Sequence, residues 1–107
     1  SIFAISVFEA QSEGNIKIAT SQAADEMLNI EGVQATFTIF ETKDSSNISS
    51  RSFGNINVQL IMEKLGGGGH QSMAGTQLKG VNAKEAYIKL TNAIDAFLEE
   101  QGRIDIK

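Results

Sequence analysis

The feature with the clearest chemical meaning is a run of four glycines followed directly by a histidine, Gly66 to His70. Glycine has no Cβ, so its backbone N–H groups can turn toward an anion at positive φ, and a ligand can approach the chain closely. A glycine run can equally be a flexible connector, but linkers usually contain serine and separate domains. This run lies between two apolar segments, which favours a phosphate cradle formed by Gly67, Gly68 and Gly69.

The single histidine of the chain strengthens this interpretation. His70 follows the glycines immediately, so its imidazole can donate a hydrogen bond to a phosphoryl oxygen, and protonation makes that bond stronger. The alternative is a surface or helix-capping histidine, which is the usual role of a lone histidine. We predict that His70 contacts phosphate and assists catalysis in a complete enzyme.

A second group of candidates precedes the glycines. Arg51 lies in a serine-rich segment with Ser49 and Ser52, where hydroxyls and a guanidinium fork could surround one phosphate. An exposed arginine among serines is also common without any function. We predict phosphate contacts for these three residues and for Asn57.

Several chemistries are disfavoured by composition. One histidine, no cysteine and scattered carboxylates do not supply a two-metal cluster, and no serine has a recognisable base partner. We therefore expect no metal site and no bound cofactor in this chain, which alone is not a complete hydrolase. The formal charge of −4 disfavours non-specific binding to nucleic-acid backbones.

The segments that must position these residues can be predicted from hydrophobic periodicity. Residues 2–7 form an almost continuous apolar run, typical of a strand covered on both faces. A helix is expected from Thr20, with Gly32 as its C-terminal cap. Residues 33–39 alternate as a strand, 43–47 form a turn, and 48–53 return as the second strand of a hairpin.

The second half continues with helices and one strand. Asn57 can cap a short helix that buries apolar side chains at positions i, i+3, i+4 and i+7, and the glycine run ends it. Residues 74–78 suit a strand. Asn82 and Glu85 resemble a capping box before a last helix, which ends near Gly102. The buried stripe of that helix is expected to contain Ala86, Tyr87, Leu90, Ala93, Ile94, Phe97 and Leu98. We predict an α/β (α+β) fold, one mixed sheet with packed helices, in the order β-α-β-β-α-β-α.

Size and hydropathy fit a single domain. The 107 residues, 41% of them hydrophobic, can bury one core, and no apolar run approaches the about 20 residues of a membrane helix. The sequence contains no leader-like segment, and the absence of cysteine agrees with a reducing compartment. The sequence starts at Ser1, and we interpret it as an excised part of a longer protein.

With these residues in view, the chain resembles a known family. Its segment 67–75 is similar to the GGGHxxAAG motif of the DHH-associated domain, the C-terminal half of DHH phosphoesterases such as RecJ-like exonucleases and nanoRNases. The serine-arginine-serine segment 48–52 matches a strand that these proteins carry before the glycine loop. The resemblance covers nearly the whole chain, 1–107. Met73 departs from the usual alanine, which affects the loop exit rather than the phosphate cradle.

A more particular resemblance lies in residues 54–65, which are similar to the membrane-anchored cyclic-di-AMP phosphodiesterases of Firmicutes, the GdpP or YybT group. It implies that the full protein hydrolyses cyclic di-AMP to pApA. Manganese would be bound by a DHH domain of the same chain that is absent here. The present domain would be cytoplasmic, without membrane contact of its own, in a parent anchored in the cell membrane. It would close over the substrate, and a homodimer is possible.

Two other readings remain open. The domain could be the same half of a nanoRNase or a RecJ-like exonuclease that acts on short RNA or single-stranded DNA, although the acidic charge and the lack of a basic, aromatic track disfavour long nucleic acids. It could also be a binding or sensor module without catalytic context. Such a module would adjoin a region that has no Asp/His cluster.

Overall fold

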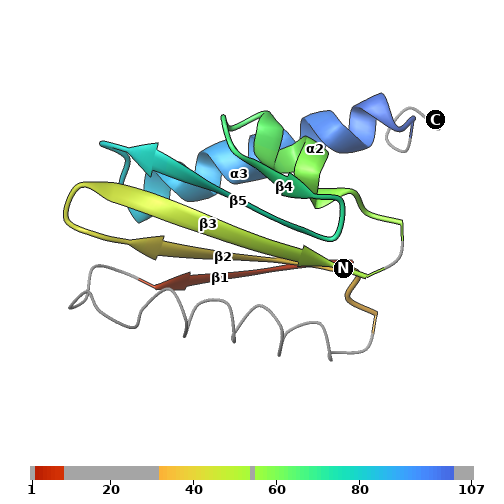
Figure 1. Ribbon diagram of the computed structural model, residues 1–107, viewed down its shortest axis with the longest axis horizontal. Helices are drawn as coiled ribbons and strands as arrows, with labels where there is room; N and C mark the ends of the chain where they lie inside the picture. Colours follow the sequence, from red (N-terminus) through yellow and green to blue (C-terminus); the bar gives the residue numbers. More distant parts are fainter. Residues whose placement is uncertain (1, 9–31, 54, 103–107) are drawn as a thin grey trace.

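The strands of the computed structural model form one mixed sheet, in the order β1-β2-β3-β5-β4 (Figure 1). The structure describes residues 2–8, 32–53 and 55–102. Within these ranges the strands are β1 (Phe3–Phe8), β2 (Ala35–Glu41), β3 (Ser45–Ser52), β4 (Gly68–His70) and β5 (Met73–Lys79), and the helices are α2 (Val58–Glu63) and α3 (Ala83–Glu100). β1 is parallel to β2, whereas the other neighbouring strands are antiparallel.

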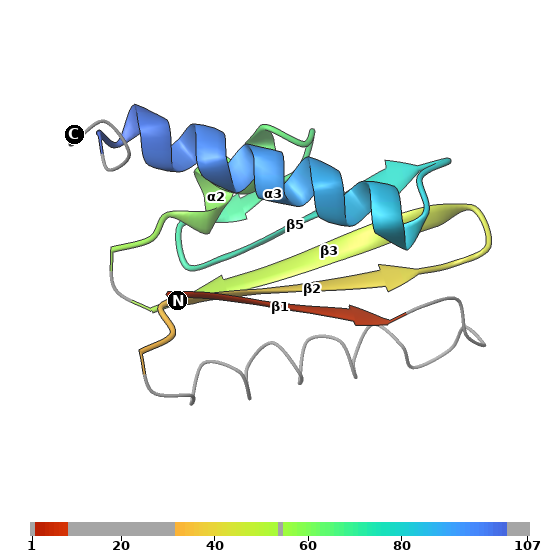
Figure 2. The same ribbon diagram turned by 180° about the vertical axis from the view of Figure 1, so that it is seen from behind.

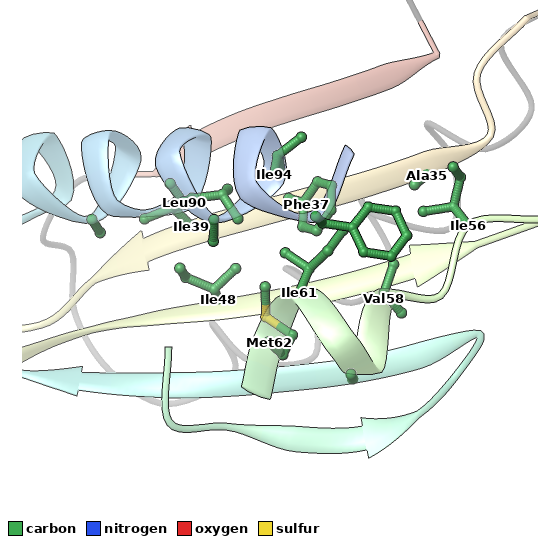
Figure 3. Packing of buried hydrophobic residues seen from close by; sticks show 14 of the residues in the cluster. Ala35, Phe37, Ile39, Ile48, Ile56, Val58, Ile61, Met62, Leu90 and Ile94 are labelled. Atoms are coloured by element: carbon green, nitrogen blue, oxygen red, sulfur yellow. The ribbon is translucent and has the colours of Figure 1, made fainter. Parts of the chain in front are cut away.

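Both described helices lie on the same face of the sheet (Figures 1 and 2). Side chains alternate between the two faces of a strand, so every second residue of β2 points toward the helices. Ala35, Phe37 and Ile39 do so, and all three are fully buried. They pack with side chains of both helices, among them Ile61, Met62, Leu90 and Ile94 (Figure 3). These contacts form the core. The alternate residues of each strand point to the opposite face of the sheet.

The helix starts follow the sequence prediction. The Asn57 side-chain oxygen accepts hydrogen bonds from the backbone N–H groups of Gln59 and Leu60 and thereby caps α2. Asn82 and Glu85 form the predicted capping box at α3. The stripe predicted for α3 is buried except at Tyr87, which is 44% exposed, and at Leu98, which is only partly buried.

The predicted order of strands and helices is confirmed, with three corrections. They do not concern the first predicted helix, from Thr20, which lies outside the described residues. The hairpin turn is shorter than predicted, because β3 begins at Ser45 and the Thr42 N–H donates to the Ser45 carbonyl at 2.7 Å. The expected cover on both faces of the first strand is incomplete, since Val7 and Phe8 are 43% and 42% exposed.

The third correction concerns the glycine run, which was expected to be a loop. Its second half is the edge strand β4, joined to β5 by the two residues Gln71 and Ser72. No helix in the described ranges is both long enough and apolar enough to cross a membrane.

Candidate phosphate-binding site

Four of the predicted site residues, Ser49, Arg51, Gly68 and His70, meet on the face of the sheet opposite α2 and α3, called here the polar face. On β3, Ile48 and Ser50 face the core, because they pair with Ile39 and Phe37 of β2. The alternate positions, Ser49 and Arg51, therefore point to the polar face. On this face Thr36 and Thr38 of β2 are fully buried. The accessible part that concerns the site lies on β3, β5 and β4.

Arg51 and His70 lie in one row across the strands. Arg51 pairs with Met73 of β5, and Met73 pairs with His70 of β4, so the three residues face the same side. Neighbouring strands are about 4.8 Å apart, which separates the Arg51 and His70 backbones by about 10 Å. Both side chains are long enough to reach a common anion above Met73, whose side chain is 49% exposed.

The neighbouring row has almost no side chains. Ser49 pairs with Gly75, and Gly75 pairs with Gly68, so two glycines lie side by side next to a serine hydroxyl. A ligand over this row meets backbone instead of Cβ atoms. The row thus forms a shallow trough beside Arg51 and His70, and its floor is open to a phosphate or a sugar.

The glycines of the run have different roles. A Cβ at Gly67 would lie 2.1 Å from the Gly75 carbonyl oxygen, and one at Gly69 would lie 2.5 Å from that of Met73. These two glycines are needed because β4 packs closely against β5. A Cβ at Gly68 would meet nothing within 4 Å. Of the three residues predicted to form the cradle, only Gly68 combines a place on the polar face with open space above it.

The backbone conformations also change the predicted mechanism. Positive φ occurs at Gly66 and Gly69, with values of 83° and 147°, but not at Gly67 or Gly68. The described segment is an edge strand rather than a nest of converging N–H groups. An edge strand exposes alternate N–H groups along its outer side, and β4 has no further strand beside it in the described sheet.

Hydrogen bonds hold Arg51 in place. Its Nη1 donates to the Ser50 carbonyl oxygen at 2.9 Å. The buried Ser50 hydroxyl in turn donates to the Ala74 carbonyl oxygen at 2.7 Å, which ties β3 to β5 beside the site. A guanidinium carries five N–H donors in a planar fork, a geometry that suits a phosphate.

Two predicted residues are placed elsewhere. Ser52 lies on the opposite side of β3 from Arg51, and its hydroxyl donates to the Gln71 carbonyl oxygen at 3.1 Å. The side-chain oxygen of Asn57 is engaged in capping α2. Their contact with phosphate stays a prediction, and the structure gives both of them a role in the fold. The sequence did not predict that Met73 and Gly75 belong to the site. The signal that could have indicated it is their alternate spacing in β5, which places both on the same face.

Metal binding has no support in this part of the molecule. Within the described ranges, no three histidine, aspartate or glutamate side chains come together in a group that could hold a metal ion. The residues described therefore do not fit the manganese site of a phosphodiesterase. Around the glycine trough the polar face offers the Arg51 guanidinium, the His70 imidazole, the Ser49 hydroxyl and open backbone.

Comparison with known proteins identifies the family. The DHHA1 domain family matches residues 3–100. The chain belongs to this family. The match includes every strand and helix of the described structure, so the polar face is part of the DHHA1 domain.

Relatives of this DHHA1 domain are named as phosphodiesterases. It is 58% identical over 81 residues to the cyclic-di-AMP phosphodiesterase PdeA of Listeria monocytogenes, covering 75% of this chain and 12% of that protein. It is 41% identical over 92 residues to the cyclic-di-AMP phosphodiesterase GdpP of Bacillus subtilis, covering 85% and 14%. The bifunctional oligoribonuclease and PAP phosphatase NrnA of Thermus thermophilus is 34% identical over 73 residues, covering 68% and 22%. The chain thus spans about an eighth of the length of the first two relatives.

Proposed function

We propose that this DHHA1 domain is the phosphate-holding half of a cyclic-di-AMP phosphodiesterase that converts cyclic di-AMP to pApA. The observation that carries the proposal is the row of Arg51, Met73 and His70 beside the trough of Ser49, Gly75 and Gly68. The identity to relatives named as cyclic-di-AMP phosphodiesterases supports this substrate.

The residues of the polar face have separable roles. The Arg51 guanidinium can donate two parallel hydrogen bonds to one phosphate and so fix its position. The His70 imidazole donates from the other side of Met73 to a phosphoryl oxygen. Gly68 and Gly75, in the row that begins at Ser49, leave the backbone beside that phosphate open to the rest of the substrate. Negative charge grows on the phosphoryl oxygens as the bond to the leaving oxygen breaks, so donors fixed in advance lower the barrier.

The remaining parts of the reaction require a companion half. The described residues do not fit a metal site, so manganese and the attacking water belong, in this proposal, to a DHH domain of the same polypeptide that faces the polar face. Membrane anchoring of the parent, a cytoplasmic position of this domain, a signalling role and homodimerisation belong to the same proposal.

The experiment that tests this function compares the chain with the longer protein that contains it. The 107-residue chain should bind pApA and leave cyclic di-AMP intact in the presence of manganese, whereas the longer protein should release pApA. Calorimetric titration and chromatography of the nucleotides give the two readouts. Turnover by the isolated chain, or failure of the longer protein to hydrolyse cyclic di-AMP, would refute the proposed division of labour.

The nanoRNase alternative is supported less. The NrnA relative is more distant, at 34% identity, than the two cyclic-di-AMP phosphodiesterases. A faster turnover of short RNA than of cyclic di-AMP by the longer protein would favour that alternative.

A further inference from the structure

A pair of side-chain amides lies on the polar face beyond the glycine trough. Asn47 of β3 pairs directly with Gln77 of β5, one row along from Ser49 and Gly75. Asn47 is partly exposed and Gln77 is exposed. Neither residue is used by the phosphate site described above.

The two amides are oriented by one hydroxyl. Asn47 Nδ2 and Gln77 Nε2 each lie 3.4 Å from the Ser45 Oγ, which also lies 3.0 Å from the Thr42 Oγ1. Ser45 itself is only 5% exposed. Among the described residues the amides have no other hydrogen-bond partner, so each keeps a carbonyl oxygen and a second N–H for a ligand.

The three rows of the polar face follow one another along the strands. Residues of the same face are two positions apart, or about 6.8 Å along a strand. The amide row is thus about 7 Å from the glycine trough and about 14 Å from the row of Arg51 and His70. A nucleotide laid along the strands would have its phosphate near Arg51 and His70, its ribose over the glycines and its base near the amides, and the side chains of the outer rows would bridge the remaining distance.

Amide side chains suit adenine in particular. Asparagine and glutamine pair with adenine through two hydrogen bonds, because the amide oxygen accepts from the exocyclic amino group while the amide N–H donates to a ring nitrogen. Guanine carries a carbonyl oxygen in place of that amino group, and its preferred partners are arginine and lysine. The amide row itself contains neither cation, and Lys79 of β5 lies in the next row beyond it.

We propose that Asn47 and Gln77 form a base-recognition subsite that selects adenine in the nucleotide whose phosphate Arg51 and His70 hold. This inference rests on the proposed function, since it uses the same phosphate site. It adds a residue pair that decides which base is accepted.

The test uses the 107-residue chain and four probes, which are pApA, AMP, GMP and inorganic phosphate. The wild-type chain should bind AMP more tightly than GMP. Asn47→Ala and Gln77→Ala should each weaken pApA and AMP binding roughly 5- to 30-fold, remove the preference over GMP and leave inorganic phosphate unaffected. Gln59→Ala is the matched control, because Gln59 lies on α2 and donates to Glu63. Circular dichroism checks the fold of each variant, and the exposed Gln77 provides a variant that does not disturb the interior.

The outcomes separate this inference from the proposed function. The amide subsite is refuted if both variants keep the wild-type preference for AMP. It is also refuted if they weaken the binding of inorganic phosphate as much as the binding of AMP. Arg51→Ala serves as the independent arm, because it should weaken all four probes. Loss of base preference at Asn47 and Gln77 with no effect of Arg51→Ala would refute the phosphate site and keep the amide subsite.

Discussion

Gly68 gives the sharpest perturbation of the phosphate site, because the structure separates it from its neighbours. Its φ is not positive, and a Cβ built on it meets nothing within 4 Å. Valine is well suited to a strand, so Gly68→Val should leave the sheet intact. We expect the free energy of unfolding to stay within about 1 kcal/mol of the wild-type value or to rise, since replacing glycine also restricts the unfolded chain.

Phosphate binding should respond very differently. The new side chain would fill the trough beside Ser49 and Gly75 and keep a phosphate away from its donors. A hydrogen bond to a charged group contributes about 1.5–3 kcal/mol, so the loss of one such contact weakens binding roughly 10- to 150-fold.

Gly67→Val is the matched control from the same run. Its Cβ would lie 2.1 Å from the Gly75 carbonyl oxygen and 2.5 Å from the Thr76 Cβ, so β4 must move away from β5. Overpacking of this kind costs about 1–3 kcal/mol, which should appear as a lower melting temperature. Thermal melts followed by circular dichroism, together with calorimetric titration of pApA, measure both effects. Normal pApA binding by Gly68→Val would show that the trough is not the site.

Three further predictions concern single side chains. Arg51→Ala in the longer protein should weaken substrate binding roughly 10- to 150-fold, and Arg51→Lys should restore it only in part because lysine lacks the planar fork. Steady-state kinetics measure both effects. Wild-type kinetic constants for both variants would show that Arg51 does not bind the substrate. His70→Ala should lower kcat more than it weakens pApA binding, because its donor acts most strongly on the charge of the transition state; an equal loss in both quantities would contradict that role. Asn57→Ala should destabilise the chain by about 0.5–2 kcal/mol through loss of the α2 cap, as measured by urea unfolding, and an unchanged midpoint would mean that the cap contributes nothing.

Periodicity and capping signals predicted most of the framework. The alternation of β2, the hairpin to β3 and both helix N-caps are local patterns, and they appear at or near the predicted residues. The edge strand β4 was missed because it is three residues long and mostly glycine, and such a strand is defined by its partner β5 rather than by its own side chains. Tyr87 has helical spacing with the buried stripe, yet it lies at the margin of the core, which only the packing decides.

The site shows the same division between local and tertiary information. Arg51, Ser49, Gly68 and His70 could be proposed from residue type, and the register brings them onto one face. The different roles of Gly67 and Gly68 could not be predicted, since they depend on which backbone atoms of β5 lie opposite. The amide row also needed the register, because Asn47 and Gln77 are thirty positions apart in the sequence.

The central claim is that the polar face of the sheet holds the phosphate, and a nuclear magnetic resonance titration of the 107-residue chain with pApA tests it most directly. The account predicts that the backbone amide signals of Ser49, Arg51, Gly68 and His70 shift together in a saturable manner, while those of α3 stay in place. Saturable shifts confined to β1 and α3, with none on β3 and β4, would contradict it.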